Sequence, residues 1–206
     1  IPMGWLILNL EEISEVITKG TTPRKSEIAQ TQEIAEVPFI KVKDIQNTGE
    51  INKTGLELIP ASISQGSLKR SILKSGDLLF SIAGTIGRVA IIDDSLENSN
   101  TNQAAGIVRL KDKESHLSIV WQLLLSHQVQ DEIFSKLVQG VQANASLKNL
   151  REIKVLMPCK DMIEIVGPKL DSIRQKILQN RIETLGLTEF RDLLLPRILS
   201  GTLELK

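Results

Sequence analysis

A run of amide and hydroxyl side chains is the part of this sequence best equipped to read another molecule through hydrogen bonds. It covers residues 98–103, Asn-Ser-Asn-Thr-Asn-Gln. Asn and Gln side chains both donate and accept, so they match the edge that adenine presents in the major groove of DNA. Amides and hydroxyls also cap turns, and on local sequence alone capping is the favoured role. The same two interpretations apply to Gln142, Asn144 and Ser146.

Basic residues that could contact phosphate groups are concentrated before residue 75. Between Lys19 and Lys74, basic residues outnumber acidic ones by nine to six. Such side chains bind phosphates without reading sequence, although isolated surface lysines are often only solvated. The whole chain carries 25 basic and 25 acidic residues, so its formal net charge is zero. A DNA-binding interpretation therefore depends on a small local excess of positive charge.

Glycines at positions 84 and 87 separate two apolar runs within residues 76–92. A phosphate-binding loop would need a Lys followed by Ser or Thr before a helix, and a dinucleotide fingerprint would need a third glycine. Neither pattern is present in this segment. The segment therefore predicts a β-hairpin whose glycines adopt positive φ.

The residues that most often perform catalysis are isolated in this sequence. His116 and His127 have no neighbouring Cys or carboxylate cluster, and Cys159 has no partner base that the sequence can nominate. We therefore expect no catalytic residue, no metal site and no directly bound cofactor. One cysteine, no signal-peptide pattern and no apolar run of about 20 residues favour a cytoplasmic protein. The first residue is Ile1, which suggests a fragment or a processed chain.

Residues 1–158 predict a β-rich mixed domain of the α+β class. Residues 5–17 fit a short strand that runs into a helix near Asn9, and residues 19–25 fit a loop. A core-packed helix is expected over residues 119–138, a link over 140–144 and a short helix or turn over 147–153. Further strands are expected at residues 39–45, 56–59, 72–73, 78–82, 89–92, 105–110 and 154–157.

Residues 162–199 predict a long amphipathic helix. Its apolar residues recur at intervals of three and four, which places them on one face. Such a helix would span about 50 Å, more than a domain of this size could cover, so we expect it to project and to need a partner. Pro168 predicts either a bend near Gly167 or a helix that begins at Pro168.

Taken together, four segments resemble the specificity subunit of type I restriction-modification enzymes, and the likeness runs along essentially the whole chain. The first comprises Pro2-Met-Gly-Trp-Leu6, Leu10-Glu-Glu-Ile13 and Gly20-Thr-Thr-Pro23. The second joins residues 39–45, Gly76-Asp-Leu-Leu-Phe-Ser81, Gly84-Thr-Ile-Gly87 and Asn102-Gln103. The third runs from Gly140 through Ser146-Leu-Lys-Asn-Leu150 and Ile153 to Pro158. The fourth and most distinctive is Leu187-Thr-Glu-Phe-Arg-Asp-Leu-Leu-Leu-Pro-Arg-Ile-Leu-Ser-Gly201.

The resemblance implies a non-catalytic protein with two parts. Residues 1–158 would be a target-recognition domain that grips one half of a split DNA site. Residues 159–206 would be a helical spacer that packs against a partner helix as an antiparallel coiled coil. The implied partners are double-stranded DNA and methyltransferase subunits, and through these the motor and endonuclease subunits. S-adenosylmethionine, ATP and Mg are therefore expected on partner subunits.

Candidate site residues follow from this hypothesis. DNA contacts are expected from loops around residues 21–25, 41–44, 84–88 and 100–103. The candidate DNA-binding residues are Lys19, Thr21, Thr22, Arg24, Lys25, Lys41, Lys43, Lys69, Arg70, Thr85, Arg88, Asn100, Asn102, Gln103, Asn144 and Ser146. The candidate helix-pairing residues are Ile163, Val166, Leu170, Ile173, Ile177, Leu187, Phe190 and Leu194.

Several alternatives stay open on the sequence. A family subunit usually holds two recognition domains and two helices, whereas this chain has one of each. It therefore resembles either a half subunit that forms a homodimer or the carboxy-terminal half of a longer chain. Neutral net charge also fits a scaffold module that binds protein instead of DNA. A third possibility is the recognition half of a fused restriction-methylation enzyme.

Overall fold

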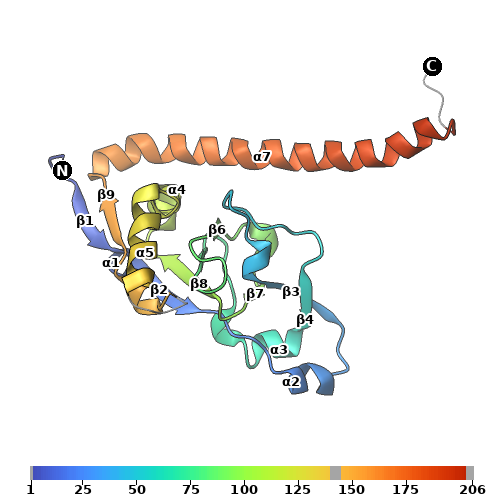
Figure 1. The fold of residues 1–206 in the computed structure, drawn as a ribbon. Helices are drawn as coiled ribbons and strands as arrows, with labels where there is room; N and C mark the ends of the chain where they lie inside the picture. The colour runs from blue at the N-terminus through green and yellow to red at the C-terminus, as the bar shows by residue number, and fades with distance from the viewer. Residues whose placement is uncertain (1, 140–144, 203–206) are drawn as a thin grey trace.

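The computed structural model describes residues 2–139 and 145–202 and has the α+β architecture that the sequence predicts (Figure 1). Three sheets form the globular part, and one long helix follows them. The strands are β1 (Leu6–Asn9), β2 (Ser14–Lys19), β3 (Ala35–Ile40), β4 (Glu57–Pro60), β5 (Leu78–Ser81), β6 (Val89–Ile91), β7 (Asn100–Thr101), β8 (Ala105–Leu110) and β9 (Lys154–Met157). The α-helices are α1 (Leu10–Ile13), α2 (Lys25–Gln30), α3 (Ala61–Gln65), α4 (Lys113–Leu124), α5 (His127–Gln139), α6 (Leu147–Arg151) and α7 (Lys160–Leu199). Short 3₁₀ turns are η1 (Val42–Asp44), η2 (Lys69–Ser71) and η3 (Asp94–Leu96).

The central sheet contains four antiparallel strands in the order β2-β8-β5-β6. Successive side chains of β5 face opposite sides of the sheet, and both sides are covered. Leu78 and Phe80 belong to a core shared with α4, α6 and β9, whereas Leu79 belongs to a second core with Ile40 and Leu73. This two-sided burial explains why β5 is a continuous apolar run instead of an alternating one.

A smaller sheet in the order β4-β3-β7 lies beside the central one. β3 runs antiparallel to β4 and parallel to β7, where Phe39 is opposite Asn100. Phe39, Ile59, Ile63 and Leu68 form a separate apolar core between this sheet and α3. The recognition loops predicted from the sequence are therefore supported by two different cores.

A buried ion pair connects the strands of the central sheet. Arg109 of β8 donates from Nε and Nη2 to the two carboxylate oxygens of Asp77, at 2.8 and 2.7 Å. Asp77 is only 1% exposed, and its carboxylate also accepts a hydrogen bond from the backbone N–H of Lys74 at 2.8 Å. The hydrogen bond with Asp77 raises the pKa of Arg109 above its ordinary value. The two-point contact satisfies a charge that would be costly to bury alone.

The ends of the globular part meet at a two-stranded sheet. β1 pairs antiparallel with β9, and Leu6 is opposite Met157. α7 begins at Lys160, shortly after β9, so the N-terminal end of the chain lies next to the start of the long helix (Figure 1). The 40 residues of α7 then run along one side of the domain, past α4, and continue beyond it.

Several predicted elements are confirmed with small shifts. The strand near residue 6, the helix that starts after Asn9 and the hairpin of β5 and β6 are all present. Gly84 and Gly87 of that hairpin have φ of 75° and 90°, as its turn requires.

Three predicted elements are wrong in extent. The strand expected over residues 39–45 ends at Ile40, because the Asp44 carboxylate accepts from the backbone N–H of Lys41 and closes the turn η1. Ile72 makes only an isolated bridge to Asn100, so no strand forms at residues 72–73. The helix expected over residues 119–138 is two helices, because Ser126 lies between them and accepts from the backbone N–H of Val129 at 3.5 Å.

The long helix begins earlier than Pro168. Its first residue is Lys160, and the helix is continuous through Pro168. A proline inside a helix removes one backbone hydrogen bond, here the bond to the carbonyl of Glu164. The packing of this part of α7 against α4, described below, compensates for that loss, so the predicted start at Pro168 is wrong.

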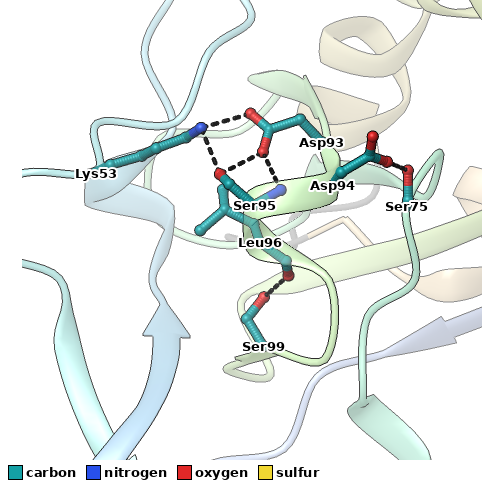
Figure 2. A network of polar contacts seen from close by, with 7 residues as sticks. All are labelled: Lys53, Ser75, Asp93, Asp94, Ser95, Leu96 and Ser99. Carbon is teal, nitrogen blue, oxygen red and sulfur yellow. Dashed lines mark hydrogen bonds and ion pairs between the residues drawn. The ribbon is translucent and has the colours of Figure 1, made fainter.

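A polar network fixes the turn η3 to the loop that contains Lys53 (Figure 2). Lys53 Nζ lies 2.7 Å from Asp93 Oδ2 and 2.7 Å from Ser95 Oγ. The other Asp93 oxygen accepts from the backbone N–H of Ser95 at 3.0 Å. Burial raises the pKa of Asp93, but the hydrogen bonds from Lys53 and Ser95 outweigh it, so the pKa lies below its ordinary value.

This network predicts a pH-dependent contribution to stability. Because the pKa of Asp93 is lowered by folding, the contribution is present above the ordinary Asp pKa of about 4 and is lost as the pH falls below it. Asp93→Asn should lower the free energy of unfolding by about 1 kcal/mol at neutral pH, and the difference from wild type should shrink toward about pH 3. Urea unfolding across this range measures it, with the exposed neighbour Glu97→Gln as control. A difference that is constant with pH would contradict the assignment.

Candidate recognition surface and helical spacer

Four candidate DNA-binding residues from three distant segments come together in the structure. We call Thr21, Thr22, Arg70 and Gln103 the polar cluster. The Thr22 hydroxyl donates to Gln103 Oε1, and Arg70 Nε donates to Thr21 Oγ1 at 3.1 Å. Thr22, Arg70 and Gln103 are exposed and Thr21 is half-buried. The cluster therefore presents hydroxyl, amide and guanidinium groups to solvent at one place.

Gly20 is the residue that positions this cluster. Its backbone N–H donates to the carbonyl of Ala105 at 3.0 Å, and the N–H of Thr21 donates to the carbonyl of Thr101 at 2.9 Å. A Cβ atom on Gly20 would lie 2.2 Å from the backbone oxygens of Thr101 and Asn102. Only glycine allows the chain to pass this close to the segment after β7, which is how Thr22 reaches Gln103.

Basic residues predicted for phosphate contact flank the cluster in sequence. Lys19 ends β2, Arg24 and Lys25 begin α2, and Lys69 precedes Arg70 in η2; all four are exposed. The Glu27 carboxylate accepts from the backbone N–H of Arg24 at 2.9 Å, which fixes the start of α2. In Figure 1, α2 and α3 lie at the end of the domain away from α7. The exposed cluster and its basic neighbours therefore belong to a part of the domain that the long helix leaves open.

Asn100 is a correction to the predicted site. It is 0% exposed, and its Nδ2 donates to the carbonyl of Leu68 at 3.1 Å. It pairs with Phe39 inside the small sheet, so its amide supports the fold and does not reach solvent.

Two other amide and hydroxyl candidates perform capping roles. Asn102 Oδ1 accepts from the backbone N–H of Ala104 at 3.2 Å and shapes the turn that presents Gln103. Ser146 Oγ accepts from the backbone N–H of Asn149 at 3.1 Å and caps α6. Asn144 lies outside the described residues. The turn-capping interpretation, which the local sequence favoured, therefore holds for Asn102 and Ser146.

The remaining basic candidates lie on the other predicted loops. Arg88 Nη1 donates to the carbonyls of Ile45 and Val42 at 2.7 and 3.4 Å, so its guanidinium connects the hairpin turn to η1. Thr85, in the same turn, is exposed and its carbonyl accepts from Ser81 Oγ at 2.5 Å. Lys41 pairs with Glu57 beside the Phe39 ring, and Lys43 is exposed. These residues are separate from the polar cluster, and Arg88 has a clear structural role.

α7 is held on the domain at two places that the sequence did not predict. The first is α4, where the buried Ser118 hydroxyl donates to Asp171 and accepts from Arg174 Nε at 3.1 Å. Gly167 is buried there, and a Cβ on it would lie 3.7 Å from the carbonyl oxygen of Ser115. The second place is an ion pair between Arg181 and Glu50 in the loop after η1. The only sequence signal for this seat is the small residue at Gly167.

The predicted pairing residues of α7 divide into two groups. Ile163 and Leu170 are partly buried against the core of their own domain, so their predicted role in contacting a partner helix is wrong. Ile173 and Ile177 are 56% and 39% exposed and lie on the neighbouring side of the helix. The domain therefore covers one face of α7, and the adjacent apolar face stays open to solvent.

We define the pairing stripe as the exposed or half-buried positions that continue this adjacent face at intervals of three and four. With about 100° per residue, these positions remain within one narrow band of the helix surface. They are Val166, Ile173, Ile177, Asn180, Thr184, Leu187, Arg191, Leu194 and Ile198. Phe190, predicted as a pairing residue, falls on the opposite side of the helix by this geometry.

A second exposed apolar face occurs only in the later part of α7. Ile182, Leu185 and Phe190 are 63%, 63% and 58% exposed, and Leu193 is 53% exposed. These residues lie away from the pairing stripe by helical geometry. A single partner helix covers a narrow seam, so it would leave this second stripe open.

Within residues 2–139 and 145–202, two kinds of site were searched for and not found. No group of three or more His, Cys, Asp or Glu residues in these ranges could hold a metal ion. No helix in them is both long and apolar enough to pass through a bilayer.

Comparisons with known proteins agree with one another. Residues 2–187 match the model of the type I restriction modification DNA specificity domain. The chain is 32% identical over 203 residues to the type I restriction enzyme HindI specificity subunit of Haemophilus influenzae, covering 98% of this chain and 42% of that protein. The HsdS subunit of Thermoanaerobacter tengcongensis has a similar fold, with a TM-score of 0.62, 14% identity and coverage of 94% of this chain and 48% of that one. A chain from a structure of the type I R-M system gives a TM-score of 0.63 at 14% identity, with 99% and 50% coverage. The chain thus spans about half the length of these relatives.

The close approach at Gly20 provides a test of how the polar cluster is held. Gly20→Ala would place a Cβ against two backbone oxygens, so the loop of residues 21–24 must move. We expect a loss of about 1–3 kcal/mol in the free energy of unfolding, as for other overpacked sites. Gly186→Ala, where nothing lies within 4 Å, should instead stabilise the protein by up to about 1 kcal/mol. Equal effects of the two variants in urea unfolding would contradict this role of Gly20.

Proposed function

Because this chain belongs to the type I restriction modification DNA specificity family, we propose that it reads one half of a bipartite DNA target. The observation that carries this proposal is the polar cluster. Thr22, Arg70 and Gln103 come from three segments, are exposed and carry groups that bond to base edges. In the free protein these side chains bond to one another, so binding would exchange those bonds for bonds to bases.

Phosphate contacts would come from the exposed basic residues around the cluster. Lys19, Arg24, Lys25 and Lys69 are well separated along the chain and carry no base-reading geometry of their own. Such contacts give affinity and register, whereas the cluster would give specificity. A neutral chain fits this division if the DNA is shared with basic surfaces of partner subunits.

The pairing stripe of α7 would hold two recognition modules at a fixed separation. Ile173 and Ile177 are exposed apolar residues on a helix that is already fixed to its domain through Ser118 and Arg181. A second helix of the same kind, packed antiparallel, would bury them as a coiled coil does. The two half-sites would then be separated by a distance that the helices determine.

The second apolar stripe of α7 would dock the methyltransferase subunit. Ile182, Leu185 and Phe190 form an exposed apolar face that neither the domain nor the pairing helix covers. Chemistry would reside in that partner and in the motor and endonuclease subunits beyond it. S-adenosylmethionine, ATP and Mg would be bound by those subunits.

A protein-binding scaffold is the second candidate function, and the neutral net charge favours it. Salt dependence separates the two candidates. A DNA reader loses affinity steeply as salt concentration rises, because phosphate contacts release counterions, whereas a protein-binding surface need not.

Base reading by the polar cluster can be tested with two neighbouring variants. Gln103→Ala should cost about 1–3 kcal/mol of binding free energy against the cognate base at one position and relax specificity there. Lys69→Ala should weaken binding to all sequences alike and reduce the salt slope by about one. Fluorescence anisotropy with the methyltransferase partner and a panel of single-base variants measures both. If Gln103→Ala weakened every sequence equally, the cluster would not be a base reader.

The two stripes of α7 can be tested with matched double variants. Ile173→Glu with Ile177→Glu should abolish helix pairing, because four carboxylates would enter the seam of a dimer, while the domain remains folded. Ile182→Glu with Leu185→Glu should leave pairing intact and prevent methyltransferase binding. Light scattering and pull-down of the methyltransferase subunit measure the two effects. An unchanged mass for the first variant would exclude the pairing stripe.

A further inference from the structure

An exposed apolar surface lies at the end of the domain where the chain begins. We call Met3, Leu6, Ile7, Met162 and Ile165 the end patch. Met3 is 98% exposed, Leu6 is 59% exposed, Ile7 is 52% exposed and Ile165 is 55% exposed. The two parts of the patch are adjacent, because Leu6 is opposite Met157 in the β1–β9 pair and a Cβ on Gly4 would lie 3.2 Å from the Cβ of Cys159. A surface of this composition is costly to leave in water.

The far end of α7 is apolar around more than one face. Leu193, Leu194 and Leu195 are consecutive, so they cover about 200° of the helix circumference. Leu193 and Leu195 are 53% and 52% exposed, and Leu199 is 79% exposed. A single partner helix buries a stripe of roughly 100°, so a second surface is needed to cover these leucines.

The attachment of the domain to α7 determines how a second copy would lie. The contacts to the domain, from Ile163 to Arg181, occupy the first half of the helix. An antiparallel pair keeps the two domains at opposite ends and leaves each second half free to pack on the other copy.

The polar residues of the pairing stripe give the register of that antiparallel pair. Asn180 and Thr184 fall close to the middle of the 40-residue helix. Polar side chains in an apolar seam are best placed against each other, so Asn180 would oppose Thr184 of the second copy. In that register Leu199 lies beside Ile165 of the second copy.

Charge at the two ends agrees with this register. Asp161 and Glu164 make the first turns of α7 acidic, and Glu164 lies within 3.8 Å of only an exposed lysine, Lys160, one turn away. Arg197 makes the last turn basic. Antiparallel packing brings these opposite charges within about one turn of each other.

We propose that the end patch receives the last two turns of α7 from a second copy of this chain. Leu195 and Leu199 of one copy would pack between β1 and the first turns of α7 in the other, and the same contact would occur twice by symmetry. The proposal rests on the helix pairing given above and adds a contact between the domain of one copy and the helix end of the other. Each recognition domain is then clasped at the pair as well as along its own helix.

Chemical crosslinking of mixed chains tests the contact directly. In a Cys159→Ser background, chains with Leu6→Cys are mixed with chains with Leu199→Cys and treated with a short bis-maleimide. We expect a crosslinked dimer only in the mixture. Leu58→Cys, an apolar strand residue that is 46% exposed and lies on β4, replaces Leu6→Cys in the matched control and should give none. A crosslink between two Leu199→Cys chains would indicate parallel helices and would overturn the proposal.

The strength of the dimer gives a second measurement. Leu6→Ser should raise the dimer dissociation constant by about tenfold, because part of a leucine side chain is no longer buried, whereas Leu58→Ser should leave it unchanged. If neither crosslinking nor Leu6→Ser has an effect while Ile173→Glu with Ile177→Glu still abolishes the dimer, the end-patch contact is wrong and helix pairing stands. A chain that is monomeric in light scattering contradicts helix pairing itself. Loss of sequence preference in DNA binding is measured separately and bears only on the polar cluster.

Discussion

The packing of α7 against α4 is the contact on which the other parts of this molecule depend. Without it, the helix would be a flexible tail and the globular part would have no defined direction. Ser118, Asp171 and Arg174 make that contact specific through hydrogen bonds, and Gly167 allows the two helices to approach. The ion pair of Arg181 with Glu50 adds a second point of attachment. Two points define a direction, so any surface on the domain has a fixed place relative to any surface on the helix.

The globular part separates support from variation. The central sheet is buried on both faces and carries the Asp77–Arg109 pair, so few of its side chains could change without a large loss of stability. The exposed polar cluster lies on loops and a 3₁₀ turn between these strands, where substitutions have a small effect on folding. A protein built in this way can acquire a different set of surface groups on an unchanged frame. This is what a family of DNA readers with different targets needs.

The sequence predicts the elements well where a pattern is local. The hairpin around Gly84, the short strand before Asn9 and the long helix are each encoded by periodicity and turn residues. Where distant segments decide the outcome, it fails. Asn100 has the same side chain as an exposed amide, and only the pairing of β7 with β3 shows that it is buried. The meeting of Thr22 with Gln103 depends on a close backbone approach at Gly20 that no local signal reveals. Likewise, the apolar spacing of α7 cannot tell which face its own domain will cover.

The pairing of β1 with β9 has an evolutionary consequence. Because the two ends of the globular part are neighbours, the chain leaves the domain at nearly the point where it began. A recombination event that replaced everything between these two strands would need to preserve only one short junction and the surface that touches α7. Target preference could then be exchanged between genes as a single block, while the length and direction of the long helix stay as they were.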